Sequence, residues 1–93
     1  MDSTIRNPPF TEKQGQYLAF IHAYGLVMGQ SPAEADMQRF FAVTPPSVHQ
    51  MVLTLERQGF ISRKPHVSRS IQLLINPKTL PRLQPVISSV QSY

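Results

Sequence analysis

The 93-residue sequence contains no cysteine, which excludes disulfide bonds, a thiolate nucleophile and cysteine-ligated zinc. It also lacks any apolar run near about 18 residues, the length that a membrane-spanning helix requires. The first ten residues, MDSTIRNPPF, have no apolar stretch that could form the core of a signal peptide. We therefore expect a cytoplasmic protein that has no membrane partner.

Acidic residues are absent from the last part of the chain. From Arg57 to the C-terminus there are six Lys or Arg residues and neither Asp nor Glu. The whole chain carries a formal net charge of +4 and has a pI near 10.0. This balance favours an anionic partner, while the hydrophobic content of 41% indicates one globular domain with a single core.

Two helix starts are marked by capping residues. Thr11 with Gln14 makes a capping box ahead of an amphipathic helix, and we expect GLVMGQ, residues 25–30, to be the loop that follows. A second helix is predicted with Ser31 as its cap, Pro32 at its first position and Glu34 completing the box. Its pattern ends near Ala42.

A third helix is predicted over residues 45–58, with Thr44 as its cap. Apolar residues recur along it at three- and four-residue spacing and define one buried face: Val48, Met51, Val52 and Leu55. Only two or three residues separate this helix from the second. Such a short connection favours the sharp crossing of a helix-turn-helix.

A small β-hairpin is predicted next. Gly59 can adopt the left-handed conformation that ends a helix, and residues 60–62 and 70–75 are typical of strands around the basic loop RKPHVSR. The expected fold class is mainly α with a small β-hairpin, a three-helix winged helix-turn-helix. We divide the chain into a flexible N-terminal arm (1–9), a winged-helix domain (10–75) and a C-terminal extension, partly ordered at most (76–93).

The exposed side of the third helix and the basic loop hold the candidate binding residues. A DNA major groove admits one α-helix, and Ser47, His49 and Gln50 lie near the helix start, where side chains can reach base edges. Cations on a hairpin can contact phosphates. The phosphate candidates are Thr54, Arg57, Arg63, Lys64 and Arg69. The alternative for both segments is an ordinary solvated surface.

No pattern for catalysis or for a cofactor is present. The three histidines, His22, His49 and His66, are too far apart in sequence to form a local metal motif. Neither a glycine-rich phosphate loop nor a nucleophile elbow occurs. We therefore expect no enzyme activity, no metal, no cofactor and no small-molecule ligand.

Residues 10–74 resemble the N-terminal winged-helix DNA-binding domain of the LexA repressors. The most specific part is the pattern S-R-x-I-x-L from Ser68 to Leu73, and the match includes further positions: Thr11, Gln14, Ile21, Gly29, Pro32, Ala35, Gly59 and Ile61. The resemblance implies that Thr44, Ser47, His49 and Gln50 occupy the base- or backbone-contacting stretch, and that Arg69 is the wing arginine.

The sequence departs from that family in two ways. Its groove-reading segment, T-P-P-S-V-H-Q at residues 44–50, differs from the S-P-N-A-A-E-E typical of the family, and the turn before it is one residue shorter. The family also has a C-terminal self-cleaving peptidase half, which residues 75–93 are too few to supply.

We therefore predict sequence-specific binding to double-stranded DNA by a small bacterial transcriptional regulator or repressor. The alternative is a winged-helix module that binds another protein and does not read DNA. Binding to RNA or single-stranded nucleic acid is a weaker third hypothesis, because the basic loop has no aromatic residue to stack on a base. A homodimer is a further candidate partner, through Leu53 or through Val86, Ile87 and Val90.

Overall fold

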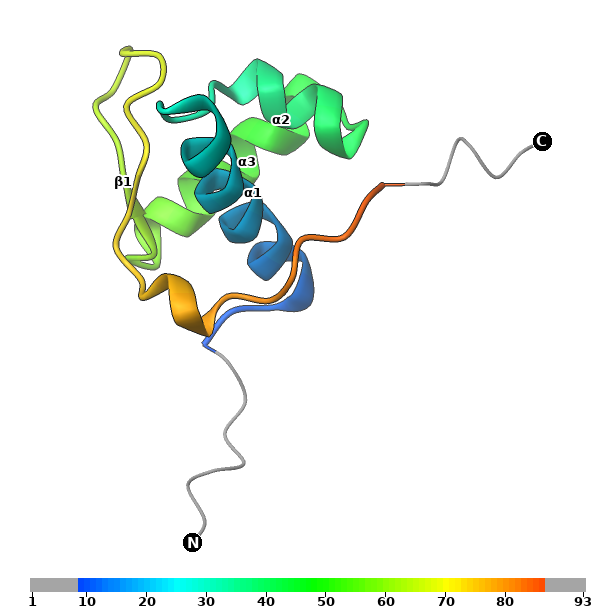
Figure 1. Cartoon of the computed structure of the whole chain (residues 1–93). Helices are drawn as coiled ribbons and strands as arrows, with labels where there is room; N and C mark the ends of the chain where they lie inside the picture. Colours follow the sequence, from blue (N-terminus) through cyan, green and yellow to red (C-terminus); the bar gives the residue numbers. More distant parts are fainter. Residues whose placement is uncertain (1–8, 87–93) are drawn as a thin grey trace, which may run out of the picture.

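The structure, a computed structural model, describes residues 9–86. Three helices are followed by a two-stranded hairpin and a short turn, in the order α1 (Glu12–Met28), α2 (Glu34–Phe41), α3 (Pro45–Arg57), β1 (Ile61–Ser62), β2 (Gln72–Leu73) and η2 (Pro77–Thr79). Figure 1 shows the hairpin standing along one side of the helices. The predicted winged helix-turn-helix is confirmed.

Helix α1 begins as predicted and ends later than predicted. The Thr11 hydroxyl accepts from the Gln14 amide (3.1 Å), and the Gln14 side chain accepts from the Thr11 amide (2.9 Å). The expected loop over residues 25–30 was wrong, because the helix continues through Gly25 to Met28. A glycine inside a helix costs only about 0.5–1 kcal/mol, so Gly25 does not stop it. The helix ends at Gly29, which has the left-handed φ of 72°.

The start of α2 also differs from the prediction. Its N-cap is Ala33, whose amide donates to the Asp36 carboxylate at 2.8 Å. The predicted cap, Ser31, lies two residues earlier, and Pro32 is buried. The helix starts later because Asp36, three residues after Ala33, accepts from the Ala33 amide, while the Glu34 carboxylate lies against His49.

A three-residue turn joins α2 to α3, which is the short connection that the sequence predicts. Ala42 takes a left-handed φ of 55°, and the Val43 amide donates to the Gln38 carbonyl at 3.2 Å. Thr44 is the N-cap of α3, as predicted. On the predicted inward face, Val48, Val52 and Leu55 are fully buried, and Met51 is half-buried against the same core.

Gly59, with φ of 83°, follows α3 and leads into the hairpin. The strands are shorter than predicted: the register pairs only Ile61 with Leu73 and Ser62 with Gln72. We call residues 61–73 the wing and residues 63–70 the wing tip. Because two residue pairs make a weak ladder, side-chain contacts must help to hold the wing tip.

The C-terminal segment packs back onto the start of α1. The Gln16 side chain donates to the Arg82 carbonyl (3.0 Å) and accepts from the Gln84 amide (2.8 Å). Leu80 and Leu83 are half-buried against the core. Figure 1 shows this segment running beside the first turns of α1.

The core lies between the three helices and the wing. Phe20, Phe40 and Phe41 form an aromatic group, and Tyr17 stacks on Phe41 with ring centroids 4.1 Å apart. The predicted assignment of Phe40, Phe41, Phe60 and Ile61 to the core agrees with this packing.

Several predictions concern segments that the structure tests only in part. Residues 1–8 of the expected arm, and Ile87 and Val90 of the expected dimer contact, lie outside the described residues. Leu53 is half-buried. Within residues 9–86, no helix is long and apolar enough to cross a membrane.

Candidate nucleic-acid interface

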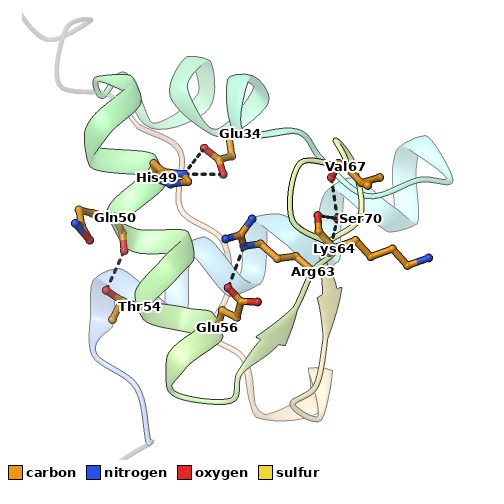
Figure 2. Close-up of polar contacts among 9 residues, drawn as sticks. All are labelled: Glu34, His49, Gln50, Thr54, Glu56, Arg63, Lys64, Val67 and Ser70. Atoms are coloured by element: carbon orange, nitrogen blue, oxygen red, sulfur yellow. Dashed lines mark hydrogen bonds and ion pairs between the residues drawn. The ribbon is translucent and has the colours of Figure 1, made fainter.

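The first turn of α3 presents short polar side chains to solvent. Thr44, Ser47, His49 and Gln50 are all exposed. The Thr44 hydroxyl lies 2.9 Å from the Ser47 hydroxyl and accepts from the Ser47 amide at 3.4 Å. Thr44 is thus exposed to solvent and also serves as the N-cap of α3. Gln50 projects from the helix away from α2 (Figure 2), and its side-chain amide can both donate and accept.

His49 is oriented by α2. Its Nδ1 lies 3.2 and 3.3 Å from the two carboxylate oxygens of Glu34 (Figure 2). A neutral imidazole whose Nδ1–H donates to Glu34 has Nε2 as an acceptor, and only the protonated ring donates from both nitrogens. His49 can therefore accept from an amino group on a base edge, or donate from Nε2 when it is protonated.

Thr54 and Arg57 lie further along the same helix. The Thr54 hydroxyl donates to the Gln50 carbonyl at 2.9 Å, and its oxygen accepts from Arg57 at 3.3 Å. The hydroxyl proton of Thr54 is therefore already engaged within the helix. Arg57 is exposed, and among residues 9–86 it makes no ion pair.

The two basic residues at the start of the wing tip point in different directions. Arg63 reaches back to α3, where its Nε donates to Glu56 at 3.0 Å, and its side chain is only 18% exposed. Lys64 extends away from the helices into solvent (Figure 2). Lys64 is therefore available to an external anion, whereas Arg63 joins the wing to α3.

Arg69 occupies a third environment, between the wing, α1 and α2. Its Nη1 lies 3.1 Å from the Tyr24 hydroxyl, 3.1 Å from Asp36 Oδ2 and 3.3 Å from the Ser31 carbonyl. The pKa of Arg69 is raised, chiefly by its hydrogen bond to Tyr24 and also by Asp36. The structure thus places the guanidinium of Arg69 among other side chains of the fold, and Lys64 lines the same open hollow beside the wing.

Asp36 is the acidic centre of this arrangement. Its pKa is lowered mainly by the hydrogen bond from the Ala33 amide, with further help from Arg69 and Arg39, and burial opposes the shift. Arg39 contacts Asp36 Oδ1 at 2.6 Å from a side chain that is largely exposed. Asp36 is thus expected to be ionised at neutral pH.

An open groove separates the wing tip from α2 and α3. Its volume is about 530 Å³. Glu34 and His49 line the helical side, while Arg63 and His66 line the wing side. The groove is open and carries both signs of charge. It therefore lacks the enclosed, mostly apolar character of a small-molecule pocket.

Sequence reasoning missed Lys13. A shallow hollow of about 330 Å³ joins the first turn of α1 to α3, and Lys13 lines it together with Ser47, Gln50 and Thr54. Nothing in the sequence indicates this proximity, because it depends on how α1 crosses α3. Lys13 therefore borders the exposed face of α3 on one side. The wing lies on the other side, where Arg63 lines the groove shared with His49, while Lys64 extends away from the helices.

Within the described residues, no group of three or more His, Cys, Asp or Glu side chains is placed to hold a metal ion. The side chains on the exposed face instead offer hydrogen bonds and positive charge. Such groups suit contacts to base edges and phosphates.

Comparison with known proteins agrees with this geometry. Residues 7–70 match the family model described as LexA DNA binding domain. The chain is similar to LexA repressors from Thermosipho africanus (41% identical over 70 residues) and Thermosipho melanesiensis (44% over 64 residues). A LexA repressor from Zymomonas mobilis is 33% identical over 79 residues.

These matches cover 75%, 69% and 84% of the present chain, and 35%, 32% and 36% of the three repressors. The chain thus spans about a third of the length of these relatives. The matched segment contains all three helices and most of the wing. The chain belongs to the LexA DNA-binding domain family.

Proposed function

We propose that this protein binds double-stranded DNA in a sequence-dependent way and acts as a repressor-type transcriptional regulator. The observation that carries the proposal is the exposed polar face of α3, with Lys13 on one side and the Lys64-bearing wing on the other. A helix presented in this way fits a major groove, and the flanking cations fit the phosphates on either side. Membership of the LexA DNA-binding domain family supports the same function.

The residues would divide between two tasks. Ser47, His49 and Gln50 would contact base edges, because they are exposed near the start of α3. Lys13, Arg57 and Lys64 would contact phosphates. Thr44 and Thr54 would act mainly through the geometry of α3, since their hydroxyls are already bonded within it.

A homodimer would complete the DNA-binding unit. A single small winged helix covers a short stretch of DNA, and two copies reading related half-sites add specificity and affinity. Selection of bound sequences from random duplexes would test this idea, because a dimer is expected to recover a palindrome with a fixed half-site spacing.

The direct test is titration of duplex DNA at several salt concentrations. Binding should weaken linearly on a log–log plot, with a slope of about −0.9 for each phosphate neutralised. Lys64→Ala should reduce the magnitude of this slope by about 0.9 and weaken all sequences alike. Gln50→Ala should leave the slope unchanged and alter sequence preference.

Two controls make the titration decisive. Lys78→Ala removes an exposed cation from η2 and should leave both the slope and the sequence preference unchanged. Absence of binding by the wild-type protein at about 50 mM salt, where phosphate contacts are strong, would contradict the proposal.

A further inference from the structure

We propose that Arg69 is a positioning residue that holds the wing against α1 and α2, and that it does not contact DNA phosphate. This inference rests on the proposed DNA binding and assigns one residue of the same site a different task. Arg69 with Tyr24, Ser31 and Asp36 is called the Arg69 cluster below.

The wing needs such an anchor because its own ladder is short. Two residue pairs join β1 to β2, and the bond from the Leu74 amide to the Phe60 carbonyl (2.9 Å) lies at the base of the hairpin. The wing tip lies beyond these bonds. Its internal bonds centre on the Ser70 hydroxyl, which accepts from the Lys64 amide at 2.8 Å and lies 2.8 Å from the Val67 carbonyl. These contacts shape the tip and do not fix its position relative to the helices.

Two arginines connect the wing tip to the rest of the molecule. Arg63 reaches Glu56 on α3, and Arg69 reaches Asp36 on α2 and Tyr24 on α1. Arg69 also lies over the Tyr24 ring, with its Cζ 5.9 Å from the centroid, a distance that suits a cation–π contact. The wing tip is thus held from two helices besides α3.

The acceptor side of the cluster is rigid. Asp36 is buried, and its carboxylate is tied to the start of α2 through the Ala33 amide. A carboxylate in this position is preorganised to receive Arg69. Loss of Arg69 would leave Asp36 with Arg39 as its remaining cationic partner among the described residues. Arg69 itself has a left-handed φ of 59°, which a non-glycine residue adopts only where surrounding contacts enforce it.

This geometry conflicts with a phosphate contact. The two protons of the Nη1 group are shared among three protein oxygens within 3.3 Å. The Nε and Nη2 groups carry the other three N–H donors of the guanidinium, so the main obstacle to a phosphate is the negative charge of Asp36. A phosphate approaching this guanidinium would meet the Asp36 carboxylate at 3.1 Å from it. Lys64, whose side chain extends into solvent, does not have this competitor.

Asp36→Asn separates the two roles, because they predict opposite changes in DNA affinity. An arginine that contacts phosphate would be released by the loss of Asp36, and DNA binding would tighten. An arginine that positions the wing would lose its anchor, and binding would weaken by about tenfold, the effect of losing one charge-assisted hydrogen bond. Asparagine keeps an oxygen that can cap Ala33, so α2 is expected to remain folded.

Three further variants complete the experiment. Tyr24→Phe should weaken binding in the same direction as Asp36→Asn, because it removes one acceptor and no charge. Arg69→Ala should weaken binding without reducing the salt slope, whereas Lys64→Ala reduces it by about 0.9. Glu12→Gln is the matched charge control: it removes one negative charge from an exposed side chain on the first turn of α1 and should not weaken binding.

NMR residual dipolar couplings of the wing-tip amides, measured without DNA, give a readout that does not depend on binding. In Asp36→Asn and Arg69→Ala the couplings of residues 63–70 should no longer fit the frame of the helices, and in Lys64→Ala they should still fit. Unchanged couplings, or tighter DNA binding by Asp36→Asn, would overturn the inference. Failure of the wild-type protein to bind DNA would instead overturn the proposed function and leave the coupling test intact.

Discussion

At the scale of single residues, Gly15 shows how the absence of a side chain can shape the fold. A Cβ at this position would lie 2.9 Å from Phe10 Cε1 and 3.0 Å from Pro81 Cγ. The Phe10 ring is itself buried and packs edge-on against Phe60, with centroids 6.1 Å apart. Gly15 therefore lets two segments from opposite ends of the chain meet over α1.

Gly15→Ala is expected to destabilise the protein despite the higher helix propensity of alanine. Overpacking costs about 1–3 kcal/mol, which exceeds the gain of about 0.5–1 kcal/mol from replacing a helical glycine. Gly25→Ala is the matched control, since nothing lies within 4 Å of a Cβ built there. Gly25→Ala should stabilise the protein by about 0.5–1 kcal/mol, which is the difference in helix propensity between glycine and alanine. Urea denaturation of both variants measures the difference, and equal stabilisation by both would show that Phe10 and Pro81 can move aside.

At the scale of elements, the start of α2 depends on one ionised carboxylate. The folded-state pKa of Asp36 is lowered, so its contribution to stability is present above the unfolded pKa of about 3.9 and is lost as the pH falls through the folded pKa. Asparagine at this position cannot titrate.

Asp36→Asn should therefore destabilise the protein by about 1–2 kcal/mol near neutral pH, a discounted value because Arg69 is 37% exposed. The difference from wild type should shrink as the pH falls below about 4, where the unfolded wild-type chain takes up a proton. It should vanish below the folded pKa, where the wild-type carboxylate is protonated in both states. Denaturation at pH 7, 4 and 2 measures this convergence. A difference that stays constant would show that the pKa of Asp36 is not lowered in the folded protein.

The elements also show which structural features can be predicted from sequence. The caps Thr11 and Thr44, the buried face of α3 and the stop at Gly59 were all predictable, because each depends on a few neighbouring residues. The C-terminal end of α1 and the N-cap of α2 were not. Gly25 was expected to start a loop, but the helix continues through it. At the start of α2, the cap forms at Ala33 with Asp36, and the predicted cap Ser31 is not used.

The sequence predicts which residues of the candidate site are exposed on α3. It does not predict which side chains pair with the arginines of the wing. The exposed positions of Ser47, His49 and Gln50 follow from helical periodicity. The contacts of Arg63 with Glu56 and of Arg69 with Asp36 join segments distant in sequence, so the net charge of the loop could not reveal them. The same reason explains why Lys13 escaped prediction.

At the scale of the whole molecule, the segment that follows the predicted domain boundary at residue 75 packs onto the helices. Residues beyond it bond to Gln16, and Leu80 and Leu83 pack against the core. Pro81 closes over Gly15. This segment lies on α1 rather than on the exposed face of α3, so its task would be stability and not DNA contact.

Replacing both Leu80 and Leu83 by alanine should therefore lower the unfolding free energy by about 2–4 kcal/mol, the sum for two leucines that are partly buried. Leu74→Ala is the control, because Leu74 is 59% exposed and its loss should change stability by no more than about 0.5 kcal/mol. DNA affinity of the folded double variant should equal that of wild type at a temperature well below its unfolding midpoint. A double variant as stable as the control would place the end of the folded unit near residue 75, and a loss of affinity without unfolding would assign this segment a part in DNA binding.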